Sequence, residues 1–420
     1  MRISTVTMFE QSTASMNRQQ GDLMKVSQQI ASGRRVVNPS DDPQAASRAV
    51  GVDQAKAVTE QYSDSRVSAR NSLSQTESII NSIGDAITSA KGLLIQASSD
   101  TLTDANRKSI ASELKGVYET MLGQANSTDG NGRYLFGGYK DNQPPFAKDS
   151  NDSVQYKGDG NVREQRVDAT RLMPVADNGE TIFKSVASGA GYVAEAKKED
   201  GTLNQGNVTF RGPQISDIGN AADFRITFTS SNTFDVETFD DTTSTWSPAD
   251  PADPTLTNVA YTGGEGEAGQ QVTFGGISIT LQGEPVDEDS ILVAKAGGAS
   301  RGADLFRTME EAIRVLENPA DDAPKKADMR NTLNTAMRDL DNSLDNVLTV
   351  RASAGARLNE LDVIDSVGSN RMLNYDQTLS DLVDLDYAEA ISEYSLRQIG
   401  MQASQKAFVD IKGLSLFNYM

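Results

Sequence analysis

The sequence predicts an α+β fold in which both chain ends form a long helical coiled-coil rod and an all-β module, sandwich or barrel-like, is inserted between them. Three observations lead to this prediction. Apolar residues recur at heptad spacing near both termini. Between these terminal stretches and the middle of the chain, apolar residues at helical spacing form long seams. The middle itself carries short β-rich runs separated by Gly, Asn and Asp. This order, helices then strands then helices, is expected when a β module interrupts a helical hairpin.

The C-terminal stretch from residue 382 to 420 carries the most regular helical stripe. Its members alternate in steps of four and three, which places them on one face of an α-helix: Tyr387, Ile391, Tyr394, Gln398, Met401, Gln405 and Phe408. Leu414 and Leu416 follow as further apolar candidates for partner contacts. A helix of about 30 residues, roughly 45 Å long, cannot bury such a stripe alone. We therefore expect a partner helix.

A second stripe near the N-terminus supplies a candidate partner. Its members recur every seven residues, and Val26 joins them three positions after the third: Phe9, Met16, Leu23 and Ile30. We predict that the two terminal helices pair and that both stripes make assembly contacts. The alternative is that two unrelated amphipathic helices pack on separate cores.

The first helix, predicted over residues 3–31, is followed by residues that end one helix and begin the next. Gly33 suits the left-handed position just past a helix end. Asp42 can cap the following helix, with Pro43 at its first position, and Asp41 favours the positive helix start. Two adjacent carboxylates could also form a metal or acid–base pair, but capping explains this pattern better.

Two more helices are predicted before the chain changes character. One spans residues 43–97, and the next begins at Thr103 or Asp104 and ends before the turn at 129–132. The seam of the first runs through Leu73, Thr76, Ile80, Ile83, Ile87, Ala90, Leu94 and Ala97, and that of the second through Ile110, Leu114, Val117 and Met121.

From residue 133 the helical periodicity stops and strands are expected. The predicted strands are 154–157, 162–167, 181–183, 208–211, 224–229, 233–239, 272–274, 277–281 and 291–294. Residues 157–161 resemble a hairpin turn, and residues 186–207 and 244–270 are expected to be loops. Many short strands with turn signals are typical of a sandwich or barrel.

Helical periodicity returns near residue 301. A short seam of Leu305, Met309, Ala312 and Leu316 precedes a break at 318–324. A longer seam then runs through Leu333, Met337, Leu340, Leu344, Val347, Arg351, Ala354, Leu358 and Leu361. Arg351 is its polar exception and is expected to snorkel or to pair with an acid.

Composition excludes several classes of function. The chain of 420 residues has a net charge of −20, which argues against nucleic acid and anionic membranes as partners. Residues 201–300 hold 3 basic and 14 acidic residues, a net charge of −11, which suits a solvated surface.

The absence of Cys and His excludes the usual zinc sites and the Cys–His and Ser–His–Asp catalytic sites. No apolar stretch suits a cleaved signal or a membrane span, so the protein is expected in the cytoplasm unless it leaves by a signal-free route.

Two motifs with possible chemistry are interpreted as structural. Residues 264–269 match GxGxxG, but a strand rather than a helix is predicted to follow, and two Glu in the loop would repel phosphate. The acidic run 287–289 lacks the ligand spacing of a calcium loop and is interpreted as a solvated acidic turn. We expect no cofactor, no metal site and no enzyme activity.

Several motifs, in their order along the chain, carry a family resemblance. They are Arg2-Ile3-Ser4-Thr5, Met8-Phe9, Ile30-Ala31-Ser32-Gly33-Arg34-Arg35, Pro39-Ser40-Asp41-Asp42-Pro43, Tyr134-Leu135-Phe136-Gly137-Gly138, Pro145-Phe146 and the ending Leu414-Ser415-Leu416-Phe417-Asn418-Tyr419-Met420. Together they resemble the flagellar hook-associated protein 3 family of the flagellin superfamily, whose members sit at the hook–filament junction. The resemblance covers residues 1–146 and 300–420. The Asp-Asp-Pro and Tyr-Leu-Phe-Gly-Gly motifs resemble these junction proteins more than flagellin itself.

The resemblance implies an extracellular structural protein of the bacterial flagellum, made in the cytoplasm and exported unfolded by the flagellar type III apparatus without a cleaved signal. Its implied partners are copies of itself in a ring, the first hook–filament junction protein, flagellin, and a cytoplasmic export chaperone that holds the C-terminal segment. Residues 1–42 and 384–420 would form terminal helices of the inner tube, marginal or disordered in the monomer. Residues 43–140 and 300–383 would form the helical rod, and 141–299 the outward-facing β module.

Other functions stay open from the sequence. A secreted adhesin, or a flagellin-like filament subunit, could use the β module as a binding surface because no motif identifies that module. An enzyme would have to rely on carboxylates in the module.

Overall fold

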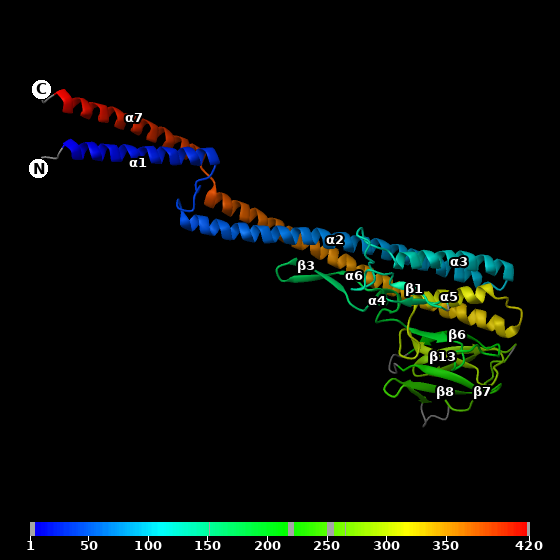
Figure 1. Cartoon of the computed structure of the whole chain (residues 1–420). Coiled ribbons are helices and arrows are strands. Elements are labelled where there is room, and N and C mark those ends of the chain that lie inside the picture. Colours follow the sequence, from blue (N-terminus) through cyan, green and yellow to red (C-terminus); the bar gives the residue numbers. More distant parts are fainter. Residues whose placement is uncertain (1–4, 151, 217–221, 250–255, 265, 418–420) are drawn as a thin grey trace. The chain divides into compact units, whose positions relative to one another are not determined.

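The computed structural model describes residues 5–150, 152–216, 222–249, 256–264 and 266–417 (Figure 1). The chain divides into two compact units, one formed by residues 1–66 and 362–420 and the other by residues 67–361. None of the described helices combines the length and the apolar character that a membrane span requires. The predicted order of helices, strands and helices is confirmed.

Long helices begin and end close to the predicted positions. They are α1 (Thr5–Ser32), α2 (Pro43–Ala97), α3 (Asp104–Ala125), α5 (Leu305–Glu317), α6 (Ala323–Val383) and α7 (Tyr387–Phe417). Thr103 caps α3 by accepting a hydrogen bond from the Asn106 amide, and Asp304 caps α5 by accepting from the Phe306 and Arg307 amides. Local capping chemistry therefore sets several of these boundaries.

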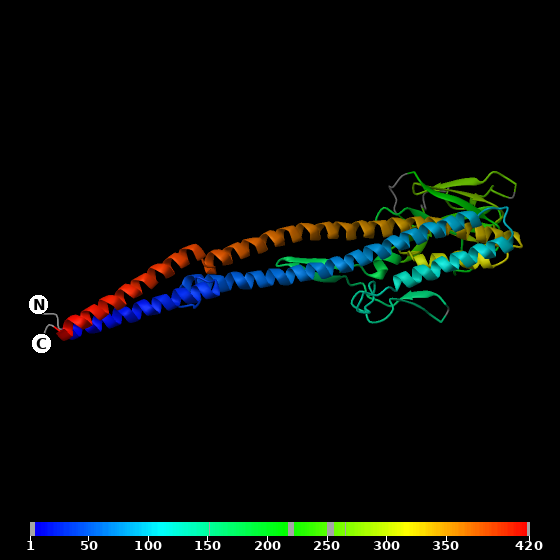
Figure 2. The same ribbon diagram turned by 90° about the horizontal axis from the view of Figure 1, so that it is seen from above.

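The predicted seams form the core of the second unit. Ile80, Ile83 and Ile87 of α2 are completely buried, and they share one apolar cluster with Leu114 of α3 and Leu333 of α6. Figure 2 shows α3 beside α2, with α6 running along the same bundle. The polar exception in the α6 seam, Arg351, pairs with Glu77 of α2 at 2.7 Å, as expected.

Aromatic residues close this core where the helices give way to strands. Phe306 at the start of α5 is 1% exposed. Its ring centroid lies 6.1 Å from that of Tyr118, 5.0 Å from that of Phe146 and 5.6 Å from that of Phe183. These four residues come from four separate parts of the sequence, so the cluster ties the first strands to the helices.

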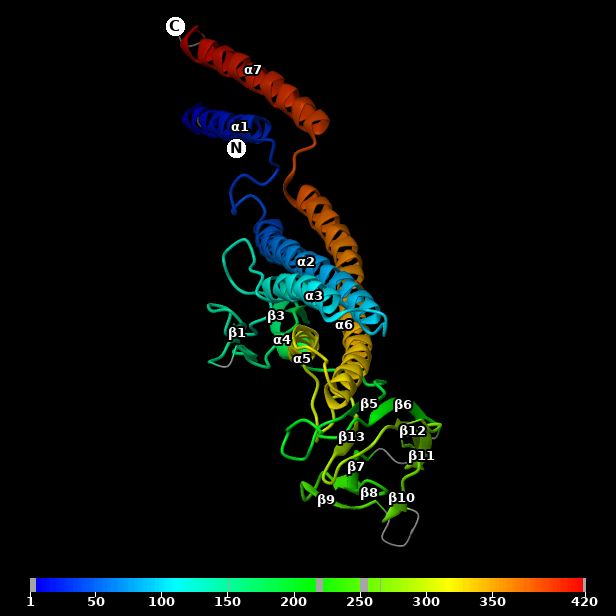
Figure 3. The same cartoon turned by 90° about the vertical axis from the view of Figure 1, so that its right-hand side faces the viewer.

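The strands form four antiparallel groups in the described part of the chain. A hairpin pairs β1 (Phe146–Lys148) with β2 (Val154–Tyr156), and another pairs β3 (Arg163–Asp168) with β4 (Arg171–Ala176). A six-stranded sheet has the order β10-β8-β7-β13-β5, with β9 on β8, and a three-stranded sheet has the order β11-β12-β6 (Figure 3). Their bounds are β5 (Tyr192–Glu195), β6 (Thr209–Ile215), β7 (Phe224–Ser230), β8 (Thr233–Asp240), β9 (Thr245–Pro248), β10 (Val259–Ala260), β11 (Gln270–Phe274), β12 (Ile277–Gln282) and β13 (Ser290–Lys295).

Three sequence predictions in this region are wrong. Residues 181–183 are not a strand but part of the short helix α4 (Gly179–Phe183), because Asn178 caps it by accepting a hydrogen bond from the Thr181 amide. The predicted loops 186–207 and 244–270 contain β5, β9 and β10, which are short and lack an alternating pattern. Residues 157–161 do not join a hairpin, since β2 pairs with β1 and β3 with β4.

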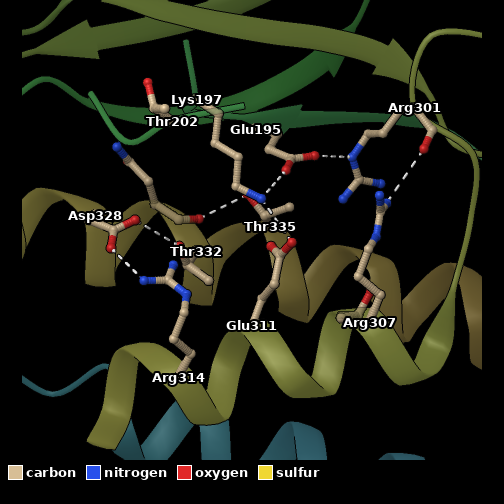
Figure 4. Close-up of polar contacts among 12 residues, drawn as sticks. Glu195, Lys197, Thr202, Arg301, Arg307, Glu311, Arg314, Asp328, Thr332 and Thr335 are labelled. Carbon is tan, nitrogen blue, oxygen red and sulfur yellow. Dashed lines mark hydrogen bonds and ion pairs between the residues drawn. The ribbon is translucent and has the colours of Figure 1, made fainter. Parts of the chain in front are cut away.

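A network of charged side chains, which we call the charged clamp, joins β5 to α5 and α6. Arg301, on the segment before α5, pairs with both carboxylate oxygens of Asp339 of α6 at 2.9 and 2.6 Å. Its Nε donates to Glu195 of β5 at 2.7 Å, and Lys197 contacts Glu195 and Glu311 of α5 at 2.7 and 2.8 Å (Figure 4). The Arg301 side chain is only 5% exposed. Removing one partner from such a buried network leaves an uncompensated charge.

Replacing Glu195 with Gln is expected to remove an acid-sensitive part of the stability. Burial by itself would raise the pKa of Glu195, but the charges of Arg301 and Lys197 outweigh it and lower the pKa to about 2 from an ordinary 4.5. A lowered carboxylate pKa stabilises the folded state above pH 4.5, and this contribution is lost as the pH falls towards 2. In urea unfolding at a series of pH values, the difference in unfolding free energy between wild type and Glu195→Gln should shrink below pH 4.5. A difference independent of pH would contradict this.

Candidate assembly interface

The terminal helices α1 and α7 lie side by side and run antiparallel (Figures 1 and 2). Near their free ends the rings of Phe9 and Phe408 lie 5.1 Å apart between centroids. Towards their other ends Arg397 pairs with Asp22 at 2.6 Å. The predicted pairing of the two termini is therefore confirmed within one chain.

The N-terminal stripe lies on the seam as its spacing predicts. Met16, Leu23 and Ile30 are half-buried, Val26 is buried, and Phe9 is 46% exposed. Even paired with α7, α1 therefore keeps much of its apolar surface in contact with water.

The C-terminal stripe divides between two faces. Tyr394, Met401 and Phe408 are half-buried, whereas Gln398 and Gln405 are exposed. Tyr387 and Ile391 are also exposed, at 51% and 54%. Ala390 is buried, and half-buried positions follow it along α7 at four–three spacing. The set is Ala390, Tyr394, Arg397, Met401, Ser404 and Phe408, with Glu393 and Gly400 half-buried beside it, and only three of its six members belong to the predicted stripe. Leu414 and Leu416 belong to α7 by their backbone, but their side chains lie outside the described residues.

The seam between α1 and α7 is only weakly apolar. Ser404 and the ion-paired Arg397 occupy positions where large apolar side chains would pack best. On α1, the buried side-chain oxygen of Gln19 has no hydrogen-bond partner among the described residues. A two-helix pair with such a seam gains little free energy from packing, so we expect it to be marginally stable by itself.

A separate apolar face of α7 is open to solvent, and the heptad pattern does not predict it. Leu396, Ile399 and Val409 are 68%, 63% and 65% exposed, and Ile391 joins them at 54%. These positions lie five, three and ten residues apart on one broad side of the helix, so a search for heptads passes over three of them. We call this set the open α7 face. Large apolar side chains exposed along one side of a helix are typical of protein–protein contact sites.

Both helix pairs are interrupted at the same level, between α1 and α2 and between α6 and α7. The two crossing segments bond to each other: the Arg35 amide donates to the Val383 carbonyl at 2.8 Å, and the Leu385 amide donates to the Gly33 carbonyl at 3.1 Å. Arg34 and Asp384 form the antiparallel bridge between them. We call this arrangement the joint.

Side chains predicted to be caps hold the joint. The Asp42 carboxylate accepts from the Ala45 amide at 3.0 Å and from the Arg35 guanidinium at 3.2 Å. Asp41 accepts from the Asn38 amide at 2.9 Å and pairs with Lys25. These bonds, the backbone amide first and the cation second, lower the pKa of both carboxyls. The capping interpretation of Asp42 and Pro43 is confirmed, since Asp42 bonds the Ala45 amide and Pro43 is the first residue of α2. Asp41 instead bonds outside α2, to the Asn38 amide and Lys25.

Replacing Gly33 with Ala is expected to loosen the joint. Gly33 has a positive φ of 69°, which costs an L-residue about 1–2 kcal/mol, and a Cβ there would lie 2.9 Å from the Tyr387 hydroxyl. Amide exchange should become faster at residues 33–35 and 383–387. Gly51→Ala is the matched control, because a Cβ at Gly51 of α2 meets open space. If both variants exchange alike, Gly33 has no special role.

The acidic run 287–289 divides between solvent and the interior, because Asp287 and Glu288 are exposed whereas Asp289 is buried. Asp289 is 1% exposed and accepts hydrogen bonds from the amides of Gln205, Gly206 and Val286 at 2.7, 2.8 and 2.9 Å. The prediction of a solvated acidic turn is therefore wrong for Asp289. Among the residues that the structure describes, no group of acidic side chains is arranged to hold a metal ion.

Comparison with known proteins places these features in context. A model of the bacterial flagellin N-terminal helical region matches residues 3–141. Flagellar hook-associated protein 3 of Escherichia coli (strain K12) is 32% identical over 418 residues, covering 99% of each chain. The protein of the same name from Salmonella typhimurium (strain LT2) is 31% identical over 417 residues, again covering 99% of each.

Solved structures show the same fold. FlgL of Xanthomonas campestris aligns with a TM-score of 0.63 at 26% identity, covering 78% of this chain and 99% of its own. A flagellar hook-associated protein-3 of Legionella pneumophila aligns with a TM-score of 0.66 at 23% identity, covering 79% of this chain and 98% of its own. Since the two curated relatives are 32% and 31% identical over nearly the whole length of both chains, the protein belongs to the flagellar hook-associated protein 3 family.

Proposed function

We propose that this chain is the structural subunit that joins the flagellar hook to the filament, and that it assembles when neighbouring subunits cover its terminal helices. The observation that carries this proposal is the open α7 face beside a weakly apolar seam. A helix with apolar side chains on both faces needs a second partner, and other copies of the chain can supply one.

The partners follow from family membership and from this surface. Copies of the chain form a ring, with the first hook–filament junction protein on the hook side and flagellin on the filament side. A cytoplasmic chaperone holds the C-terminal segment before the type III apparatus exports the unfolded chain. The open α7 face supports this step, because exposed apolar surface favours aggregation when it has no partner.

Burial energies support assembly through these helices. Each large apolar side chain that becomes fully buried contributes about 1.5–3 kcal/mol. The open α7 face offers Ile391, Leu396, Ile399 and Val409, each more than half exposed. The free energy from burying them offsets the entropy lost when the terminal helices become ordered. We propose that residues 1–42 and 384–420 are marginal in the monomer and become rigid in the ring.

The middle of the chain takes no part in these contacts in our proposal. Residues 141–299 face outward, and the net charge of −11 over residues 201–300 keeps this surface solvated. Residues 43–140 and 300–383 form the rod between this surface and the inner tube.

Deletion of the gene tests the proposed function. The expected cell has intact hooks, lacks filaments and releases flagellin into the medium, and a plasmid copy restores filaments. Normal filaments in the deletion strain would exclude a junction role. A loss of surface adhesion with normal filaments would favour the adhesin instead.

Amide exchange in the isolated protein tests the assembly mechanism separately. Exchange is expected to be fast in α1 and α7 and slow at residues 70–125 and 335–365, where the α2, α3 and α6 seams are buried. Equal protection along the whole chain would show that the termini are already stable and would contradict this mechanism.

A further inference from the structure

The second unit contains two apolar cores rather than one. Among the described residues, one cluster holds the helical seams together with β1, β2 and α4, and a separate cluster runs from Tyr192 to Val293 within the sheets β5–β13. Residues 192–296, which we call the β5–β13 module, therefore have a core of their own. A body with its own core has the basic requirement for folding independently.

Glycine-containing segments connect this module to the helices at both ends. Residues 185–191 include Gly189 and Gly191, and residues 297–302 include Gly297, Gly298 and Gly302. Gly297 and Gly302 have positive φ angles of 73° and 69°. Such segments can change conformation more easily than most.

The face of α6 that meets the module is polar. Its residues recur at spacings of three and four, which places them on one side of the helix: Asn331, Asn334, Thr335, Arg338 and Asp339. The apolar seam through Leu333 and Leu340 occupies the opposite side. Asn331, Thr335 and Asp339 are buried at 3%, 6% and 8% exposure, so both sides of α6 are covered, one by an apolar core and the other by the module.

Most contacts from this polar face go to main-chain atoms of the module. The Asn331 amide donates to the Val208 carbonyl at 2.8 Å and accepts from the Phe210 amide at 3.2 Å. Thr335 Oγ1 donates to the Ala194 carbonyl at 2.6 Å.

Two longer contacts complete the set. Asn334 reaches the Phe210 carbonyl at 3.4 Å, and Arg338 reaches the Tyr192 carbonyl at 3.5 Å. These four α6 side chains therefore recognise groups that every residue carries, whatever its side chain. The charged clamp of Arg301 with Asp339 and Glu195 adds the side-chain contacts.

We propose that this polar face of α6 is a docking surface that recognises the main chain of the β5–β13 module, and that the module can leave it and return as a folded body. Undocking exposes polar groups that water can satisfy rather than an apolar core. The two glycine-containing segments allow the movement. Because hydrogen bonds and ion pairs dominate this interface, with the small Ala327 as its buried apolar member, docking is a separate equilibrium from the folding of either body.

The absence of Cys makes a distance measurement straightforward. Asp345→Cys on α6 and Asp241→Cys between β8 and β9 are exposed sites for a pair of spin labels, one on each body. The docking variant is Asn331→Ala/Thr335→Val. Its matched control is Asn359→Ala/Thr349→Val, the same changes at exposed positions of the same helix.

The wild type and the control are expected to give one narrow distance distribution. The docking variant should give a broad distance distribution instead, while its helical circular dichroism stays unchanged. A narrow distribution in the docking variant would overturn the proposal, and so would a loss of its helical signal, which would show that the two bodies fold as one. In the wild type, rising urea should broaden the distance distribution at a lower concentration than the one at which the helical circular dichroism falls. If both signals change at the same urea concentration, the proposal is wrong, and this test needs no substitution in the docking surface.

Discussion

Replacing Ile391 with Asp is expected to leave the free protein folded and to abolish filament attachment. The Ile391 side chain is 54% exposed in the free chain, so a carboxylate there stays hydrated. Once neighbouring subunits cover the open α7 face, the same carboxylate would be buried without a partner, which costs several kcal/mol for each ion. In the proposed ring every subunit would carry the change, so the penalty would be repeated at each contact. Electron microscopy of the cells should show hooks without filaments, and motility should be lost.

The control is a second apolar-to-Asp substitution, placed outside the terminal helices. Leu203 lies before β6 and is 43% exposed, and Leu203→Asp should leave motility unchanged because we propose that this region faces solvent. Circular dichroism and the molecular mass of both purified variants should match those of the wild type. If Ile391→Asp cells swim normally, the open α7 face is not an assembly surface.

The largest expected loss of stability follows from replacing Phe306 with Ala. Phe306 is 1% exposed and its ring packs against those of Tyr118, Phe146 and Phe183. Truncating a buried Phe to Ala costs about 3–5 kcal/mol, since it removes apolar contacts and leaves a cavity. Chemical denaturation, followed by circular dichroism, measures the change in unfolding free energy.

Tyr139→Ala serves as the reference for this measurement. The Tyr139 side chain is 64% exposed, and a surface change of this kind alters stability by about 0.5 kcal/mol or less. Equal losses in the two variants would show that the aromatic cluster does not support the fold.

The helices could be predicted closely because their signals are local. Pro43 at the first position of α2 and Gly33 after α1 mark chain breaks through their own backbone preferences. The seams of α2 and α6 also followed from spacing alone, since an apolar residue every three or four positions has few other structural explanations.

The polar face of α6 could not be predicted in the same way. Asn331 and Thr335 are buried only because main-chain groups from far along the sequence bond to them. In the sequence they resemble an exposed helix face. The α7 stripe shows a related difficulty, because two overlapping stripes share Tyr394, Met401 and Phe408, and only the position of α1 shows which of them forms the seam.

The strands were less predictable because short segments carry little pattern. Residues 181–183 have a β-like composition, but the cap at Asn178 starts a helix there. The strands β9 and β10 depend on pairing with β8 rather than on their own sequences. Tertiary contacts outweigh local preference at such positions.

The joint has a mechanical consequence. Because the Gly33 and Val383 carbonyls are each taken by the opposite crossing segment, neither connection can swivel without releasing the other. We therefore expect a twisting load on one connection to pass to the other through these two hydrogen bonds, so that both connections turn together.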